Sequence, residues 1–256
     1  MRFRPVIVGL LTLLLAGCAT DRLDQAKVAD IKKVAVMSII GDQLTMTEVA
    51  MTAFGNDHEY GDISAWGIDP HVVDLVSSQL KSRLQVVPVS YTTADFPQEG
   101  ITNLIGGGID YWAPLGERIR DKVATQPNAR DIDAYLVVVK GQSYIEQSNQ
   151  VAFGLGIARR FALTTHRYYV HALYDLVLID GRSFKPLRDV SYQLPNLSPW
   201  DSYPALRGPY KPVDGSYWAD SYAALSPDIR EQIRRDLLNL IDTTLPHYVQ
   251  RTGLLQ

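Results

Sequence analysis

Cysteine is almost absent from this chain. Its 256 residues contain a single cysteine, Cys18, so no disulfide can form within one molecule. A chain of this length must therefore be stabilised by a conventional hydrophobic core. Basic residues are also too few to dominate the surface, because the formal net charge is −3. Proteins that bind nucleic acid carry clustered lysine and arginine, so we expect no nucleic-acid partner.

A long hydrophobic run is missing as well. The N-terminal apolar run, Val6 to Leu15, is far shorter than the roughly 20 residues that a membrane-spanning helix needs. Arg2 and Arg4 precede this run, and the small residues Ala16 and Gly17 follow it. This order is typical of a secretory signal peptide, which is removed from the mature protein.

The cysteine directly follows that apolar run. Leu15-Ala16-Gly17-Cys18 resembles the bacterial lipobox, in which the cysteine is acylated and becomes the first residue of the mature protein. The resemblance implies a signal peptide over residues 1–17, acyl chains such as palmitate on Cys18, and a lipidated tether over residues 18–30. Two or three acyl chains hold a protein firmly on a membrane. Ala19 stands where lipoproteins kept at the inner membrane often carry aspartate, which implies the outer membrane, with the domain facing the periplasm.

The remainder, residues 31–256, is expected to form a single periplasmic domain. Runs of β-branched residues indicate strands, and stripes with a 3.6-residue period indicate helices. Asp69-Pro70 is expected to start a helix with Asp69 as its cap, and Pro246 to end or kink the last helix. The order of elements predicts an α/β fold of the α+β sandwich type. It has a mixed sheet, helices mainly on one face, a long C-terminal hairpin and a terminal amphipathic helix. We predict strands over residues 33–40, 44–54, 86–89, 134–140, 164–179 and 184–194, and helices over 69–83, 113–126 and 226–246.

The predicted hairpin carries a resemblance. It reads Leu173-Tyr-Asp-Leu-Val-Leu-Ile-Asp-Gly-Arg182, with Asp180-Gly181 at a tight turn. Together with a strand near the mature N-terminus and two helix–strand units, this phrase resembles exported proteins that share the fold of the TolB amino-terminal domain. The curli-secretion lipoprotein and lipoprotein activators of penicillin-binding proteins belong to that group. The resemblance covers roughly residues 31–194 and implies an α/β domain of the cell envelope.

Motifs for chemistry are a further absence. Gly141-Gln-Ser143 lacks the second glycine of a nucleophile elbow, and Gly106-Gly-Gly108 lacks the third glycine of a dinucleotide fingerprint. Asp57-His58-Glu59-Tyr-Gly-Asp62 is the densest set of possible metal ligands, and we interpret it as a solvated connection. His166 and His171 lie five apart on a predicted strand, so they face opposite sides. The sequence assigns no catalytic, cofactor-binding or metal-binding residue, and we predict a protein without enzymatic activity.

Aromatic residues and proline concentrate in residues 195–225, which hold six aromatics and five prolines. Tyrosine and tryptophan both stack and hydrogen-bond, so the segment suits a partner or ligand surface. The same side chains also suit a cover over an open edge of the core, and the sequence leaves both interpretations open. The candidate partner-binding residues are Trp200, Tyr203, Tyr210, Tyr217, Trp218 and Tyr222.

These observations favour an outer-membrane lipoprotein that acts through protein contacts, as an adapter or an envelope assembly factor. Its expected partners are the membrane, through Cys18, and an envelope protein or a second copy of the chain. One alternative is a module that binds a glycan or small ligand with the aromatics of residues 195–225. The other is an envelope hydrolase whose site assembles in three dimensions from Asp57, His58, Asp62, Asp131 and His166.

Overall fold

The computed structural model describes residues 26–50, 56–96, 109–146, 148–162, 164–192 and 204–256. Its content of helices and of sheets with parallel and antiparallel strands confirms the predicted α+β class. The strands form two five-stranded sheets and one two-stranded sheet, where the sequence pattern predicts one mixed sheet. Within the described ranges, no helix has both the length and the apolar character needed to cross a membrane.

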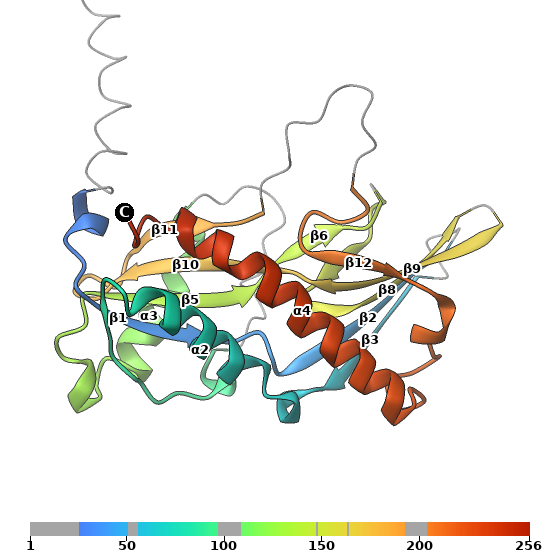
Figure 1. Ribbon diagram of the computed structural model, residues 1–256, viewed down its shortest axis with the longest axis horizontal. Helices are drawn as coiled ribbons and strands as arrows, with labels where there is room; N and C mark the ends of the chain where they lie inside the picture. Colours follow the sequence, from blue (N-terminus) through green and yellow to red (C-terminus); the bar gives the residue numbers. More distant parts are fainter. Residues whose placement is uncertain (1–25, 51–55, 97–108, 147, 163, 193–203) are drawn as a thin grey trace, which may run out of the picture.

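The elements alternate along the chain between the two large sheets. The helices are α2 (Ile68–Leu80), α3 (Ala113–Lys122) and α4 (Pro227–Arg251). The strands are β1 (Lys33–Ser38), β2 (Gln43–Val49), β3 (Asp57–Asp62), β4 (Gln85–Val86), β5 (Ala134–Lys140), β6 (Gln142–Tyr144), β7 (Val151–Phe153), β8 (Leu155–Ala162), β9 (Thr165–Ala172), β10 (Tyr174–Asp180), β11 (Pro186–Val190) and β12 (Tyr210–Val213). Sheet A has the strand order β11-β10-β5-β1-β4, sheet B has the order β12-β9-β8-β2-β3, and β6 pairs with β7. Figure 1 shows sheet A at the left, sheet B at the right, and α4 running diagonally across both.

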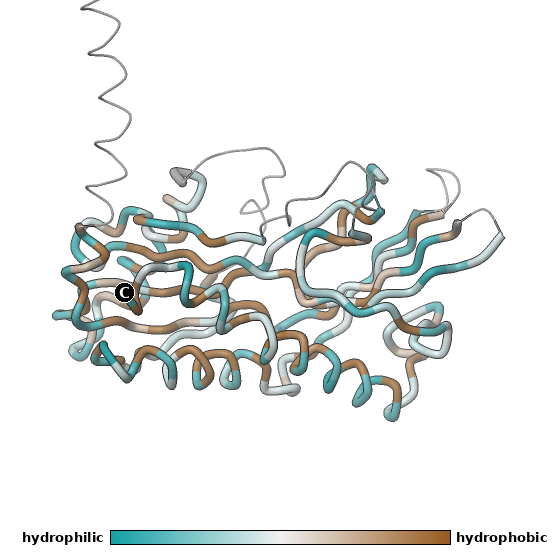
Figure 2. The backbone as a smooth tube through the Cα atoms, turned by 45° about the horizontal axis from the view of Figure 1, so that its top comes forward, coloured by the Kyte–Doolittle hydropathy of each residue, from teal (hydrophilic) through white to brown (hydrophobic). Residues whose placement is uncertain are grey.

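Sheet A is covered on both faces. Every residue of its central strand β5 is buried. Leu136 and Val138 join the core under α2 and α4, whereas Val137 and Val139 join the core under α3 on the opposite face. A strand between two helical layers needs apolar side chains on both sides, which explains the unbroken aliphatic run in the sequence. Figure 2 shows these strands in brown, the colour of hydrophobic residues.

The helix α4 packs against sheet B as well as sheet A. Met46, Ile157 and Val170 belong to the same core cluster as the inner residues of α4. The opposite face of sheet B carries a smaller cluster that includes Ala158 and Tyr169. Toward the far ends of its strands sheet B becomes hydrophilic, as Figure 2 shows in teal. The helix α4 therefore ties two sheets of unequal burial into one core.

The long strand predicted over residues 164–179 is wrong, because the structure divides it at Leu173. Its first part is β9 in sheet B and its second part is β10 in sheet A. Both parts are rich in apolar residues, so the pattern contains no signal for the change of sheet. The predicted hairpin turn after Asp180 is confirmed, because β10 and β11 pair antiparallel across it.

The terminal helix confirms its predicted stripe and contradicts its predicted end. Ser226 caps α4 by accepting a hydrogen bond from the Ile229 N–H at 3.3 Å. Pro246 does not end the helix, which continues to Arg251. A proline removes a single main-chain hydrogen bond, whereas the turn that follows buries Tyr248 and Val249 in the core. That burial keeps the chain helical past the proline.

Two segments predicted as irregular are edge strands. Residues 57–62 form β3 rather than a connection, and Tyr210–Val213, inside the aromatic segment, forms β12. Edge strands of sheets carry charges and proline, so they lack the apolar alternation that signals a strand. The strand predicted to run to residue 54 ends at Val49, and residues 51–55 lie outside the described residues.

Candidate functional site

The outer side of β3 is the open edge of sheet B. Among the described strands β3 pairs with β2 alone. Just beyond this ladder, Ile63 donates its backbone N–H to the Asp42 carbonyl at 3.1 Å. Hydrogen-bonded and non-hydrogen-bonded pairs alternate in an antiparallel ladder, so alternate residues of β3 turn their main-chain groups away from β2. Those residues are His58, Tyr60 and Asp62.

Tyr222 covers one end of this edge. Its hydroxyl donates a hydrogen bond to the Asp62 carbonyl at 3.1 Å, which agrees with the outward direction of that carbonyl. Its ring lies against Gly61, where an added Cβ would stand 2.1 Å from a ring atom. The part of the edge that stays open is His58 to Tyr60, and the Tyr60 side chain is 54% exposed.

A small acidic cavity lies beside the open edge. Its volume is about 200 Å³. The charged residues among its described lining are all acids, and one aromatic side chain forms a wall. The lining residues are Met46, Glu48, Asp57, Glu59, Trp218 and Asp220.

The acids of this cavity are only partly neutralised. Arg159 places Nη2 at 2.5 Å from Glu48 Oε2, and its guanidinium carbon lies 4.6 Å from the centre of the Trp218 ring. Within the described part of the chain, no ion pair involves Asp57, Glu59 or Asp220. The cavity therefore keeps an excess of negative charge and suits a positively charged group.

A second cavity lies at the carboxyl end of β1. The strands β1 and β4 are neighbours, and the chain after β1 leads to α2 on one face of sheet A, whereas the chain after β4 leads to α3 on the opposite face. Such a switch point in an α/β sheet leaves a crevice outside the carboxyl ends of the strands. The cavity measures about 450 Å³, and most of its lining residues carry a hydroxyl or carboxylate group. Its lining is Ser38, Gly41, Asp42, Ser64, Asp69, Pro70, Val73, Asp74, Tyr91, Thr92 and Thr93.

Asp69 organises this second cavity rather than its own helix. The N-cap position of α2 is Gly67, and no side chain caps the helix, so the predicted capping role of Asp69 is wrong. Its Oδ1 accepts hydrogen bonds from Ser38 Oγ at 2.6 Å and from the backbone N–H groups of Ile40 at 2.9 Å and Gly41 at 3.0 Å. The carboxylate thereby fixes the turn from β1 to β2.

Burial raises the pKa values of two groups in this cavity, Asp69 and Tyr91. It raises the pKa of Asp69, although hydrogen bonds from Ser38 and from the neighbouring main chain act in the opposite direction. Burial also raises the pKa of Tyr91 to about 12, so the phenol stays protonated at neutral pH. The Tyr91 hydroxyl accepts a hydrogen bond from the Ser38 N–H at 2.8 Å and donates one to the Ser38 carbonyl at 3.1 Å. These contacts suit binding of a polar molecule.

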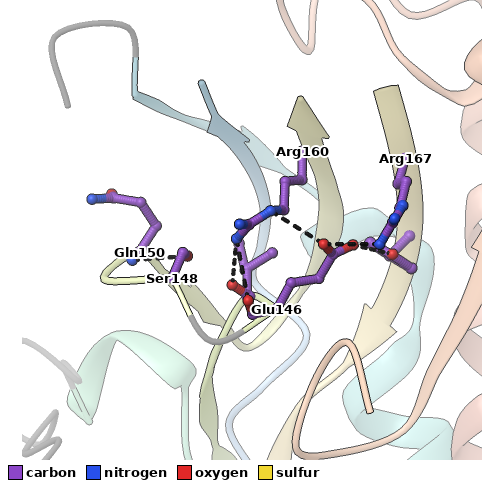
Figure 3. Close-up of polar contacts among 7 residues, drawn as sticks. Glu146, Ser148, Gln150, Arg160 and Arg167 are labelled. Carbon is purple, nitrogen blue, oxygen red and sulfur yellow. Dashed lines mark hydrogen bonds and ion pairs between the residues drawn. The ribbon is translucent and has the colours of Figure 1, made fainter. Parts of the chain in front are cut away.

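A third polar cluster, centred on Glu146, has a structural role. Figure 3 shows its carboxylate between Arg160 and Arg167. Glu146 Oε2 lies 3.1 Å from Arg160 Nε and 3.2 Å from Arg167 Nη1, and Tyr169 donates its hydroxyl proton to Oε1. Glu146 has a φ of 43°, in the left-handed region, and its N–H bonds the Ala205 carbonyl at 2.7 Å. The cluster fastens the loop after β6 to β8 and β9.

The predicted aromatic residues divide into two sets. Trp200 and Tyr203, like Cys18, lie outside the described residues. Tyr217, Trp218 and Tyr222 are partly buried and pack against the main core. Tyr210 is partly buried against the smaller cluster of sheet B. The last four serve as cover in this structure, and two of them also border the open edge.

The acids and histidines proposed for a hydrolase do not converge in the described structure. Of that set, the acidic cavity contains Asp57 alone. On β3 the side chains alternate, so His58 points away from Asp57, and its Nδ1 lies 3.3 Å from Thr47 Oγ1. His166 is exposed, and its ring centre lies 5.0 Å from that of Phe161 with the two planes tilted by 59°. Asp131 is exposed at a distant turn.

The two histidines of β9 confirm the predicted alternation. β9 pairs with β8 in unbroken register over both residues, so His166 and His171 face opposite sides. His171 is fully buried, and its Nδ1 lies 3.1 Å from the Gly154 carbonyl. In the part of the chain that the structure describes, no group of three or more histidine, cysteine or acidic side chains is arranged to hold a metal ion.

Sequence reasoning missed the cavity at β1 and the Glu146 cluster. Ser38, Asp69 and Tyr91 come from three separate segments, and no spacing along the chain relates them. For β3 a usable signal was present, because acids at the alternating positions Asp57 and Glu59 are typical of a guarded edge strand.

Comparisons with known proteins identify no family for this chain. No family model matches the chain, and no curated protein matches it. Among solved structures, a hypothetical protein from Chlamydia trachomatis is similar at 8% sequence identity and a TM-score of 0.27, covering 86% of this chain and 98% of that chain. A TM-score of this size supports no conclusion about fold or function.

Proposed function

We propose that the chain is an outer-membrane lipoprotein, attached through Cys18 and facing the periplasm, that binds other proteins as an adapter or envelope assembly factor. The observation that carries the proposal is Leu15-Ala16-Gly17-Cys18 directly after a signal-like apolar run. The described domain begins soon after this cysteine, and Val28 and Ile31 already pack into its core. In this proposal, the residues between Cys18 and this packed segment form the tether, as in the envelope lipoproteins that the sequence resembles.

The position of the open edge of sheet B supports the binding of a partner protein. Figure 1 shows the start of the described chain, in blue, at the sheet A end of the molecule, away from β3. The open edge of sheet B therefore stands away from the anchored end. An open strand edge is a common docking site for an extended segment of another protein.

Fractionation of a Cys18→Ala variant tests the anchor. We expect the variant to move from the membrane to the soluble periplasmic fraction with an unchanged melting temperature, because the described domain begins at residue 26. Thr20→Ala is the matched control and should stay on the membrane. Retention of the Cys18→Ala variant in detergent-soluble membranes would place the anchor elsewhere.

A second candidate function is binding of a small polar ligand in the cavity at β1. The favouring observation is its position at a switch point, with about 450 Å³ lined by hydroxyls and carboxylates. Because the charged lining is acidic, we expect a ligand with a positive charge and further hydrogen-bond donors.

Three sugars of one ring size test this second function. D-glucosamine should raise the melting temperature, whereas D-glucose should do so less and D-glucuronate not at all. Asp74→Asn removes one acid of the cavity wall and should reduce the glucosamine effect, while Glu117→Gln on the opposite face should not. Equal effects of all three sugars, or none, would remove the cavity as a ligand site.

A further inference from the structure

We propose that the open edge of β3 binds an extended segment of a partner protein in which basic and apolar residues alternate, so that this segment becomes a further strand of sheet B. The inference rests on the adapter function proposed above and deepens it, because it names the chemistry of the partner.

The main chain of β3 offers the first half of the binding site. The His58 N–H donates a hydrogen bond to Asp57 Oδ1 at 2.8 Å. The outward C=O group of His58 and the outward N–H and C=O groups of Tyr60 have no partner among the described residues. Tyr222 holds the Asp62 carbonyl and marks where the open edge stops. An added strand satisfies such groups by continuing the ladder, which is how many domains bind extended peptides. The open edge is short, so side chains must supply the rest of the affinity.

The acidic cavity offers the second half. Asp57 and Glu59 alternate with the outward-facing residues and point to the side of sheet B where the cavity lies. Every second side chain of an added strand points to that same side. A lysine at such a position reaches a cavity of about 200 Å³ between acids and the Trp218 ring. Arg159 already neutralises Glu48, so the charge left over is that of the other acids.

The opposite side of the edge selects an apolar residue. Tyr60 projects there and is 54% exposed, the largest exposure among the large hydrophobic side chains that the structure describes. An aromatic side chain on a strand packs best against a β-branched or aromatic neighbour on the next strand. Alternate positions of the partner should therefore be basic on one side and β-branched on the other.

The charge of β3 argues against a second copy of the chain as the occupant. Two β3 edges paired together would bring Asp57, Glu59 and Asp62 of one copy near the same acids of the other. Like charges on directly opposite strands are destabilising, and such charges are a common guard against self-pairing. These acids therefore disfavour pairing with the β3 edge of a second copy and favour a basic partner.

Peptide binding to the full-length chain in non-ionic detergent tests the proposal. The probe is an eight-residue peptide of alternating lysine and valine. One control peptide has glutamate in place of lysine, and another carries N-methyl groups on alternate residues, which block strand pairing. We expect the lysine–valine peptide to bind and to slow hydrogen exchange at the Tyr60 amide, whose N–H faces outward from β3. Both controls should bind about tenfold more weakly or worse, which corresponds to about 1.4 kcal/mol, because each loses hydrogen bonds or charge interactions with β3.

Matched variants locate the binding site on β3. Tyr60→Pro removes an outward N–H without removing a β2–β3 hydrogen bond, so it should fold and lose binding, while Tyr60→Val should retain most of it. Asp57→Asn should weaken binding by about two- to fivefold, and Asp30→Asn, a matched change at an exposed position before β1, should leave binding unchanged. If Tyr60→Pro fails to fold, the N-methylated peptide and Asp57→Asn still decide the question.

Several outcomes would overturn the proposal. They are no binding of the lysine–valine peptide, equal binding of the glutamate peptide, or binding by a folded Tyr60→Pro variant equal to that of the unchanged chain. A dimer in sedimentation that Tyr60→Pro dissolves would make a second copy the occupant and reject the basic partner. None of these results changes the fractionation of Cys18→Ala, so failure of the edge and failure of the anchor are distinguishable.

Discussion

Sheets A and B have the same number of strands but different degrees of burial. In sheet A, α2 and α4 cover one face and α3 covers the other, and its central strand is buried along its whole length. In sheet B, α4 and the aromatic cover protect one face, and the edge strand β3 is largely exposed. Sheet A is therefore the more completely covered sheet, whereas sheet B leaves charged side chains exposed at its edge strand.

The two sheets also differ in how they treat ionisable groups. Sheet A contains Asp175, whose pKa burial raises to about 7, with a further contribution from nearby Asp189. Sheet B contains His171, whose pKa burial lowers to about 4, against a weaker effect of its hydrogen bond to Gly154. Each group is neutral in the folded protein near neutral or mildly acidic pH, but their effects on stability have opposite signs.

Truncation of the shared helix should have the largest effect. Leu237 is fully buried in the core that joins both sheets. We expect Leu237→Ala to lower the free energy of unfolding by about 2–5 kcal/mol, because it leaves a cavity. Asn239→Ala, an exposed position on the same helix, is the control and should change stability by no more than about 0.5 kcal/mol. Chemical denaturation measures both. Separate unfolding of the sheets in the Leu237→Ala variant would show that α4 does not join them.

Truncation of the aromatic cover should come next. Trp218 is partly buried against the core and stacks on Arg159. Trp218→Ala should lower stability by about 2–3 kcal/mol, below the roughly 3–5 kcal/mol for a fully buried tryptophan. Trp218→Phe keeps most of the packing and serves as the control. An unchanged melting temperature with reduced partner capture would instead make this residue a binding contact without a covering role.

The pH dependence should separate the two sheets. The folded pKa of His171 is lower than its unfolded value of 6.5, so its contribution to stability is complete above pH 6.5 and is lost as the pH falls toward 4. The folded pKa of Asp175 is higher than its unfolded value, so its contribution is complete at low pH and is lost as the pH rises toward 7. Between pH 4 and 6.5 the two effects oppose each other.

Replacing one of these two ionisable groups should expose the effect of the other on the pH dependence of stability. An Asp175→Asn variant should lose about 2 kcal/mol between pH 7 and pH 4.5, because His171 then acts unopposed. His171→Asn should show the reverse slope over the same range. Thermal unfolding across the pH range measures both variants. Parallel stability curves for the two variants would show that neither group has the shifted pKa stated here.

The smallest effect is expected at the open edge. Tyr60 makes no contribution to the buried core, and its side chain is mostly exposed. Tyr60→Ala should change the free energy of unfolding by no more than about 0.5 kcal/mol. The change in the free energy of unfolding for Tyr60→Ala is compared with that for Leu237→Ala under the same denaturation conditions. A loss above about 1 kcal/mol would mean that sheet B depends on its edge for stability.

Much of the fold could be read from the sequence where local pattern and burial agree. The aliphatic run of β5, the stripe of α4 and the turn after Asp180 were all predictable, because each is encoded by neighbouring residues. The change of sheet at Leu173 could not be predicted, since the buried second half of β9, Leu173 and β10 follow one another without a polar break. The sequence pattern of β3 predicts a connection rather than a strand, because an edge strand needs no apolar face.

The candidate sites were less predictable than the fold. The outward groups of β3 depend on the hydrogen-bonding phase of its ladder with β2, which residue types do not specify. The acidic cavity joins β2, β3 and the segment around Trp218, which lie far apart in the chain. The aromatic residues of that segment are visible in the sequence, but they fit both a cover and a binding surface.

By itself, the sequence determined the net charge, the single cysteine with its lipobox-like setting, and the class of fold. Short-range chemistry is sufficient for these, because signals, caps and periodic stripes are local. Only the tertiary structure decided which strand forms an open edge, which acids share a cavity, and that Asp69 holds the turn after β1 rather than its own helix. These depend on contacts between residues distant in the chain, and such contacts exist only after the core has brought the two sheets together.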